Sequence, residues 1–290
     1  LLIWEDYVHP DALPKFIEET GIEVEVAEYE TVEECRDMIE SSPGSYDVVV
    51  AEAGVVTEWA ELRLLQKVNH EKLPLLSNIE PRYMNLETDP NNTYSVPFQT
   101  GTTVIAYRAD KVAPSAKSWN FFWEESVKGN AHILDSPREI FSIALLRNGT
   151  TFNKANDSDF DQAETDLIEM VEQNRVQIGE AWDILDLLTA GDTWAVQAYN
   201  GDAAMYAAEN ENIAIFMPQE GATEWLDNLC LARDCTNVAE AHMLINFMLR
   251  PEIAAMTAEH TRYATPNKAA FPLLAEDLRS DPIVFPPAEV

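Results

Sequence analysis

The apolar and polar positions of the first 65 residues alternate between strand and helix patterns. Residues 1–4 are apolar and predict a buried strand. Residues 11–20 then place apolar side chains at helical spacing and are followed by a glycine, a common helix stop. Residues 22–27 alternate apolar and charged side chains, which predicts a half-exposed strand. Thr31, followed three positions later by Glu34, predicts the start of a second helix.

A third strand and helix complete this pattern. Residues 46–51 are almost continuously apolar, which is typical of a parallel strand buried on both faces, and residues 55–65 form an amphipathic helix pattern. Right-handed crossovers turn such an order into a parallel sheet with helices on both faces. Ligands of these sheets bind beyond the carboxyl ends of the strands, here residues 4–7 and 52–54.

The pattern restarts after about residue 102, which predicts a second α/β lobe. The intervening residues 72–98 are rich in loop signals. Further strands are predicted at residues 102–107, 131–134, 194–199 and 213–218. Further helices are predicted at residues 119–125, 139–146, 163–174, 183–190, 239–250 and 252–260.

The charge balance excludes several classes of protein. The chain has 19 Lys+Arg and 51 Asp+Glu, a formal net charge of -32. Such a surface repels nucleic acid phosphates and anionic lipids, whereas 46% hydrophobic residues suffice for a folded core. The acidity is spread along the chain, so it fits either general solvation in a salty or crowded medium or the capture of cations.

No apolar run is long enough to span a membrane, and no secretory signal precedes the first strand. A mature or trimmed product would begin in this way, so the missing signal does not favour the cytosol. The spacing of Cys230 and Cys235 predicts a local disulfide in an oxidising compartment, with free thiols as the alternative; a free thiol is expected for Cys35.

Sequence signatures of catalysis and metal binding are absent. There is no nucleophile elbow, phosphate-binding loop or dinucleotide fingerprint, and the five histidines do not cluster in sequence. Residues 157–161 resemble a calcium loop but lack its glycine and its final glutamate. The chain is therefore expected to be no enzyme and to hold no cofactor or metal.

Aromatic residues beside carboxylates recur where predicted strands end. They occur in three segments, residues 4–7, 199–202 and 225–227. One such pair has no meaning beyond a core aromatic next to a surface acid, but three pairs suit a cationic amine. Aromatic faces attract an ammonium group, and a carboxylate accepts a charge-assisted hydrogen bond from it.

At these residues the chain resembles the periplasmic spermidine/putrescine (polyamine)-binding protein family of ABC transporters. The resemblance covers nearly the whole chain. It is carried by residues 3–7, 16–22, 46–50, 89–97, 137–141, 225–227, 244–251 and 263–267.

The resemblance implies an α/β, two-lobed periplasmic-binding-protein-like fold with two interlobe crossings and hinge closure. The crossings are expected near residues 100–104 and 225–229. Lobe one is expected to comprise residues 1–102 and 228–252. Lobe two is expected to comprise residues 103–227 and 253–290.

The resemblance also assigns roles to site residues. Trp4 and Tyr7 are implied as aromatics of lobe one. Asp227 is implied to grip an amine at the second crossing. The remaining aromatic walls are implied to be Tyr199, Trp225 and Tyr263, and the lobe-two carboxylates Glu139 and Asp202. Three further carboxylates are expected near the entrance: Glu5, Asp6 and Glu52.

Three positions depart from the family pattern. Glu52 stands where a small hydroxyl residue is usual, Gly54 stands where an aromatic or polar residue is frequent, and Ser136 stands where spermidine binders often have aspartate. The length of the preferred amine and its number of nitrogens are therefore left open.

The expected function is that of a periplasmic or otherwise extracytoplasmic, monomeric protein that captures a di- or polyamine between its lobes for an ABC permease. Two alternatives remain at this stage: an adaptor that presents the bound amine to a membrane sensor, and a binder of another small amine-containing solute.

Overall fold

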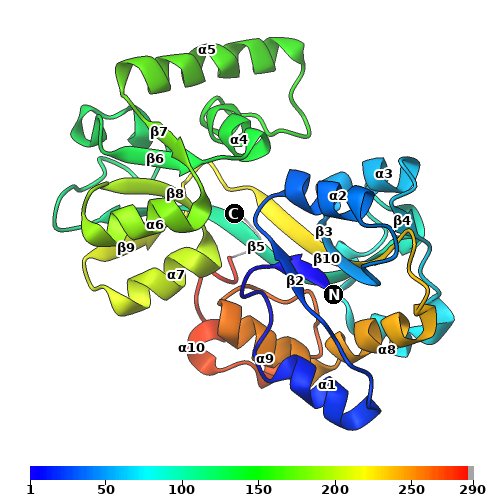
Figure 1. Cartoon of the computed structure of the whole chain (residues 1–290). Helices are drawn as coiled ribbons and strands as arrows, with labels where there is room; N and C mark the ends of the chain where they lie inside the picture. The colour runs from blue at the N-terminus through cyan, green and yellow to red at the C-terminus, as the bar shows by residue number, and fades with distance from the viewer. Residues whose placement is uncertain (287–290) are drawn as a thin grey trace. The chain divides into compact units, whose positions relative to one another are not determined.

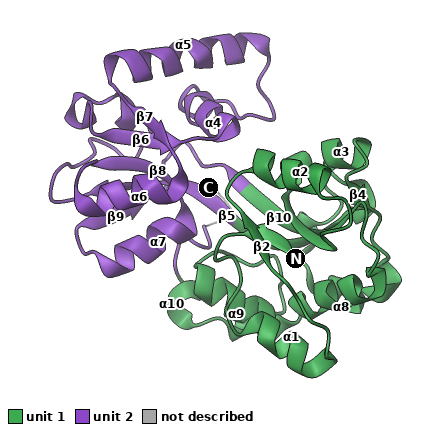
Figure 2. Cartoon of the chain, viewed as in Figure 1, with its two compact units in different colours: residues 1–100, 225–280 green, residues 101–224, 281–290 purple. Residues whose placement is uncertain are grey.

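The computed structural model describes residues 1–286, which form two compact units (Figure 2). Unit 1 comprises Leu1–Thr100 and Trp225–Ser280, and unit 2 comprises Gly101–Glu224 and the described residues from Asp281. The chain therefore passes between the units three times, after residues 100, 224 and 280, whereas the expected lobe bounds placed the last passage after residue 252. Residues 253–280, expected in the second lobe, belong to unit 1.

The packing of one helix explains this difference. Helix α9, Pro251–Thr261, buries Ile253 and Ala258 and packs against α1, Ala12–Thr20, and α8, Val238–Met248. Because its apolar face completes the core of unit 1, the chain returns to unit 2 only after this helix and the short α10, Glu276–Arg279.

The sheet of unit 1 is mixed rather than wholly parallel. Its strands follow the order β2-β1-β3-β10, with β1 parallel to β2 and β3, and β10 antiparallel to β3. The bounds are β1 Leu2–Trp4, β2 Ala27–Tyr29, β3 Val48–Glu52 and β10 Glu224–Ala232, with β4 Leu65–Gln66 beside β10. The sequence did not identify β10 as a strand, because the polar pair Asp227-Asn228 interrupts its apolar pattern.

Strand β2 begins later than the sequence predicted. Residues 22–26 alternate apolar and polar side chains as a strand would. They have no ladder partner, because the first residue of β1, Leu2, pairs with Ala27. Helix α2, Val32–Ser41, begins as predicted: the Thr31 side chain accepts a hydrogen bond from the Glu34 amide. The third helix of this segment is α3, Ala53–Glu61.

Short 3-10 segments fill the loop-rich stretch that precedes β5. They are His70–Lys72, Pro74–Asn78, Pro81–Tyr83 and Pro90–Asn92, and a later one in unit 1 is Phe271–Leu273. Strand β5, Ser95–Arg108, then carries the chain from unit 1 into unit 2 and is longer than the predicted strand at residues 102–107.

The sheet of unit 2 lies between two layers of helices (Figure 1). Its strands are the second half of β5, then β8 Ala195–Tyr199, β6 Ala131–Leu134 and β7 Gln177–Gly179, with β9 Ile213–Phe216 on the other side of β5. Its helices are α4 Pro137–Arg147, α5 Asp157–Gln173, α6 Ala181–Ala190 and α7 Asn200–Glu209, besides the 3-10 segments Trp119–Trp123 and Glu125–Val127.

Alternation along β5 places side chains in both layers of unit 2. Ile105 packs with residues of α4 and α5, whereas Val104 and Ala106 pack with residues of α6 and α7. Successive side chains of a strand point to opposite faces of the sheet. The two helical layers therefore bury opposite faces of one sheet, which confirms the predicted α/β class for this lobe.

Helix α5 starts six residues before the predicted position. Asn156 accepts hydrogen bonds from the amides of Ser158 and Asp159, and the Asp159 carboxylate accepts one from the Asn156 amide. This capping box extends the helix into the acidic segment that resembled a calcium loop. The acids therefore serve the helix N-terminus.

The predicted disulfide is absent: Cys230 and Cys235 are buried free thiols. Cys230 points from β10 into the core of unit 1, where Cys35 also lies. Cys235 lies after the strand and its thiol contacts Asp47; burial, followed by this contact, raises the pKa of Cys235 to about 12. The two side chains are therefore held in different surroundings despite their short spacing.

Candidate functional site

Three elements of unit 1 bring predicted site residues to one edge of its sheet. Strands β1 and β3 are parallel, so Trp4 and Glu52 end neighbouring strands at the same edge. Strand β10 runs antiparallel to β3 and places Asp227 directly opposite Glu52 in the ladder. Residues paired in this way have side chains on the same face of a sheet.

Asp227 is the centre of this group of residues. It is only 5% exposed, and the Tyr7 hydroxyl donates a hydrogen bond of 2.6 Å to its Oδ2 atom. Burial is the main cause that raises the pKa of Asp227 to about 7. The hydrogen bond from Tyr7 and the Trp4 indole N–H oppose this rise, whereas the Glu52 carboxylate adds to it. Burial and the neighbouring Asp227 raise the pKa of Tyr7 well above its ordinary value.

Aromatic rings form a continuous series beside this carboxyl group. The Tyr7 ring centroid lies 6.0 Å from that of Tyr263 and 6.1 Å from that of Phe98. The Trp225 ring meets Tyr263 edge-on at 4.7 Å. Trp4 packs on Tyr29 at 4.3 Å. We call the six residues Trp4, Tyr7, Glu52, Trp225, Asp227 and Tyr263 the acidic aromatic cluster.

Supporting residues missed by the sequence analysis fix the backbone of this cluster. Gln99 donates a hydrogen bond to the Tyr7 carbonyl at 2.9 Å and accepts one from the Thr261 hydroxyl at 2.8 Å. The Thr100 hydroxyl donates to the Trp225 carbonyl at 2.6 Å. The available signal was the polar Gln99-Thr100 pair that follows apolar Phe98, but the strand was predicted to begin only at residue 102.

Two predicted residues lie apart from the cluster. Glu5 is exposed, as is Asp6, whose Oδ1 atom lies 2.9 Å from Nε2 of His260 on α9. Asp6 also adopts a left-handed backbone conformation, with φ at 49°. Its side chain therefore ties the loop after β1 to α9.

Unit 2 presents its own carboxylates at a strand edge. Strands β6 and β8 are parallel neighbours, so α4 and α7, which follow them, begin at the same edge. Glu139 lies in the first turn of α4 and Asp202 in the first turn of α7, where the helix dipole favours negative charge. Both are buried, 4% and 6% exposed. Tyr199 ends β8 immediately before α7.

Local contacts hold Glu139 and account for Ser136. The Gln197 side chain, fully buried in β8, donates to Oε2 of Glu139 at 3.4 Å and to its carbonyl at 3.3 Å. Ser136 is the N-cap of α4, and its hydroxyl accepts a hydrogen bond from the Glu139 amide. Serine at this position therefore serves the helix start.

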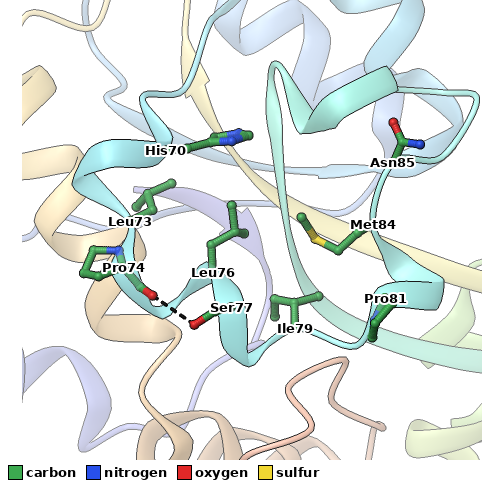
Figure 3. Close-up of a pocket in the computed structure, with 9 residues that line it drawn as sticks. All are labelled: His70, Leu73, Pro74, Leu76, Ser77, Ile79, Pro81, Met84 and Asn85. Carbon is green, nitrogen blue, oxygen red and sulfur yellow. Dashed lines mark hydrogen bonds between the residues drawn. The ribbon is translucent and has the colours of Figure 1, made fainter.

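Other candidate sites in the described residues lack this chemistry. Within residues 1–286, no three His, Cys, Asp or Glu side chains come close enough to hold a metal ion. A hollow of about 690 Å³ lies among the 3-10 segments of unit 1 (Figure 3), lined between His70 and Asn85 by mostly apolar side chains and by no carboxylate. No helix in this part of the chain is long and apolar enough to cross a bilayer.

A family model described as bacterial extracellular solute-binding protein matches residues 11–286. The chain belongs to this family. Membership makes the protein an extracytoplasmic solute-binding protein. The predicted class of function and the predicted location are thereby confirmed.

Relatives within the family are similar over almost the full chain. The spermidine/putrescine-binding periplasmic protein of Escherichia coli is 32% identical over 288 residues, which are 99% of this chain and 82% of the relative. The putrescine/agmatine-binding protein of Pseudomonas aeruginosa is 30% identical over 301 aligned residues, covering 97% and 82%. These relatives support the predicted polyamine-binding resemblance.

Solved structures agree with the two-lobed α/β fold of this solute-binding protein. A putative spermidine/putrescine ABC transporter protein from Listeria monocytogenes matches with a TM-score of 0.88 and 32% identity, covering 99% of this chain and 89% of the other. The spermidine/putrescine ABC transporter substrate-binding protein PotD from Streptococcus pneumoniae matches with a TM-score of 0.88 and 27% identity, covering 99% and 88%.

Proposed function

We propose that this solute-binding protein captures a di- or polyamine and delivers it, chemically unchanged, to an ABC permease. The observation that carries the proposal is Asp227, a buried carboxyl group among aromatic rings to which no lysine or arginine is bonded in residues 1–286. Buried charges are normally paired. An ammonium group of the solute would supply the missing positive charge.

The chemistry of the cluster suits an ammonium group on an alkyl chain. A hydrogen bond between ionised partners contributes about 1.5–3 kcal/mol, and each aromatic face in contact with the cation about 0.5–2 kcal/mol. The rings of Tyr7, Trp225 and Tyr263 also offer apolar surface for methylene groups. Sugars and anions lack the positive charge that this surface requires.

The comparisons favour transport over sensing. The named relatives bind spermidine, putrescine or agmatine, and two similar structures are described as parts of ABC transporters. A permease partner therefore has support that a membrane sensor lacks.

Calorimetric titration tests the proposal with putrescine, cadaverine, spermidine and agmatine. We expect at least one amine to bind with micromolar or tighter affinity. Asp227→Asn should weaken that binding by about 10- to 100-fold, because it removes the ionised acceptor. Glu28→Gln, which removes an exposed carboxylate from β2, is the matched control and should bind as the parent does.

The outcomes separate ligand class from site. If every amine binds more weakly than about millimolar, the proposed function is wrong. If an amine binds but Asp227→Asn retains full affinity, the ligand class stands and the acidic aromatic cluster is not its site. Glu139→Gln and Asp202→Asn are proposed to weaken binding as well, because both carboxylates lie buried at a ligand-type strand edge.

A further inference from the structure

Glu52 and Asp227 place two carboxyl groups side by side in unit 1. They are directly paired in the antiparallel ladder of β3 and β10, and Asp227 is 5% exposed. Glu52 also precedes α3, but its side chain makes no capping hydrogen bond to that helix. Two negative charges on directly paired residues repel each other where water is scarce, and the Glu52 carboxylate acts on Asp227 in this way.

The other groups that face Asp227 carry no positive charge. The groups that interact electrostatically with it are Trp4 and Tyr7 from β1 and its loop, Tyr29 from β2, Cys35 from α2 and Cys230 from β10 itself. Tyr29 donates its hydroxyl proton to the Val50 carbonyl, and Tyr7 alone of these donates a hydroxyl hydrogen bond to Asp227. Neither the Tyr7 hydroxyl nor the Trp4 indole N–H carries a charge that would offset the half-buried Glu52 carboxylate.

We propose that the Glu52–Asp227 pair holds one proton when no amine is bound, and that an incoming ammonium group displaces this proton into solvent. The inference rests on the proposed amine-binding function and assigns Glu52 a role in specificity. Protons and charge balance in this exchange. Before binding, the pair consists of one carboxylic acid and one carboxylate; after binding, two carboxylates contact the ammonium ion and one proton has entered the solvent.

A primary ammonium group fits this exchange better than other cations. Its three N–H donors can serve both carboxylates at once, and its positive charge removes the repulsion that held the proton. A quaternary ammonium has the same charge but no donor, so it would leave both carboxylates without hydrogen bonds. The pair therefore favours solutes with a terminal primary amine.

The direction of the pH dependence follows from the protonated starting state. The pKa of Asp227, raised by burial to about 7, means that protonation of the empty site falls as pH rises. Putrescine nitrogens, like lysine, stay protonated up to about pH 10. We expect binding to release roughly 0.9 proton at pH 6, 0.5 at pH 7 and 0.1 at pH 8, and affinity to rise about tenfold from pH 6 to pH 8.

Calorimetry of the full chain with putrescine, in pairs of buffers that differ in ionisation enthalpy, measures the released protons directly. Glu52→Gln removes the repelling charge, so the release curve should shift to lower pH by about one unit. Glu28→Gln removes an equal charge from an exposed position of β2 and should leave the curve in place. Titration with tetramethylammonium tests the requirement for N–H donors.

Each result bears on the pair separately from the proposed function. Release at pH 6 that shifts in Glu52→Gln but not in Glu28→Gln supports the exchange. Putrescine binding without proton release at pH 6 overturns it, although amine binding itself would stand. Release that Glu52→Gln leaves unshifted also overturns it, since another group would then be titrating. Failure of every amine to bind would instead remove the proposed function.

Discussion

At the scale of the residue, the Asp227 carboxyl group leaves water on folding and meets no positive charge within unit 1. Its pKa rises from the ordinary value of 3.8 to about 7, chiefly through burial. The folded chain therefore keeps a proton that the unfolded chain releases near pH 4. The folded state loses stability relative to the unfolded state as pH rises from about 4 to 7, and this loss persists above pH 7.

Asp227→Asn is therefore expected to stabilise the protein while it weakens binding. Asparagine does not titrate, so its stability advantage should be about 1–3 kcal/mol larger at pH 8 than at pH 5. Urea unfolding at both pH values, without amine, measures the difference. The control is Asp37→Asn, an exposed aspartate on α2. An advantage for Asp227→Asn that is equal at the two pH values would contradict the raised pKa.

Candidate site residues at strand ends could be found from the sequence, whereas the residues that hydrogen-bond to their backbone could not. Trp4, Tyr7 and Asp227 stand out because aromatic and acidic side chains adjoin apolar segments. Gln99 and Thr100 act through hydrogen bonds to the backbone of residues distant in sequence, which no local pattern encodes. Asp6, expected near the entrance, makes a long-range contact to His260 on α9 that no local pattern encodes either.

At the scale of the element, the C-terminus of α6 depends on a glycine and an arginine. Gly191 adopts φ of 85°, and Arg108 donates hydrogen bonds from Nη1 to the carbonyls of Leu188 and Thr189. Asp110 holds the same guanidinium group through two further hydrogen bonds. A Cβ atom at position 191 would lie 2.8 Å from Nη1 of Arg108.

Gly191→Ala should consequently cost more than backbone strain alone. Gly21, the C-cap of α1, has a similar φ of 70°, but a Cβ there would meet nothing within 4 Å. Gly21→Ala should cost about 1 kcal/mol of unfolding free energy and Gly191→Ala roughly 1 kcal/mol more. Urea unfolding compares the two variants. Equal losses would show that Arg108 moves aside without penalty, contrary to this expectation.

The elements that the sequence predicted well are those whose pattern is local. The capped start of α2 and the buried strand β3 follow from neighbouring residues. The start of β2 depends on where its partner β1 begins, and β10 is a strand because it pairs with β3. Such pairings join residues far apart in the chain. The local alternation of apolar and polar residues therefore placed β2 too early and did not reveal β10.

At the scale of the whole molecule, a net charge of -32 surrounds the proposed amine site with a negative field. Such a field steers cations toward a protein and is screened by salt over about 10 Å at 0.1 M ionic strength. The proposed contacts of a bound amine involve the buried Asp227 carboxyl group, which salt screens less than exposed charges, so salt should act mainly on the association step.

Raising NaCl from 20 to 500 mM should lower the association rate constant for putrescine by about tenfold and change the dissociation rate constant much less. Stopped-flow tryptophan fluorescence measures both, since Trp4 and Trp225 belong to the acidic aromatic cluster. Sucrose at matched viscosity is the control for slower diffusion. If the association rate is insensitive to salt, the acidity serves solvation alone.

The division into units illustrates the limit of sequence reasoning at this scale. The restart of the strand and helix pattern predicts two α/β lobes. It does not predict which lobe contains residues 253–280. Helix α9 joins unit 1 because its apolar face fits α1 and α8. A helix pattern shows that a face is apolar without showing which core it completes.

The three buried thiols have a practical consequence. Cys35, Cys230 and Cys235 are no more than 5% exposed, and burial raises the pKa of Cys35 and Cys235 to about 12. Thiol-directed dyes react with the exposed thiolate, so they should spare all three native positions. A single cysteine introduced on the surface can thus carry one fluorophore, so the natural chain becomes a scaffold for an optical sensor of the solute that it binds.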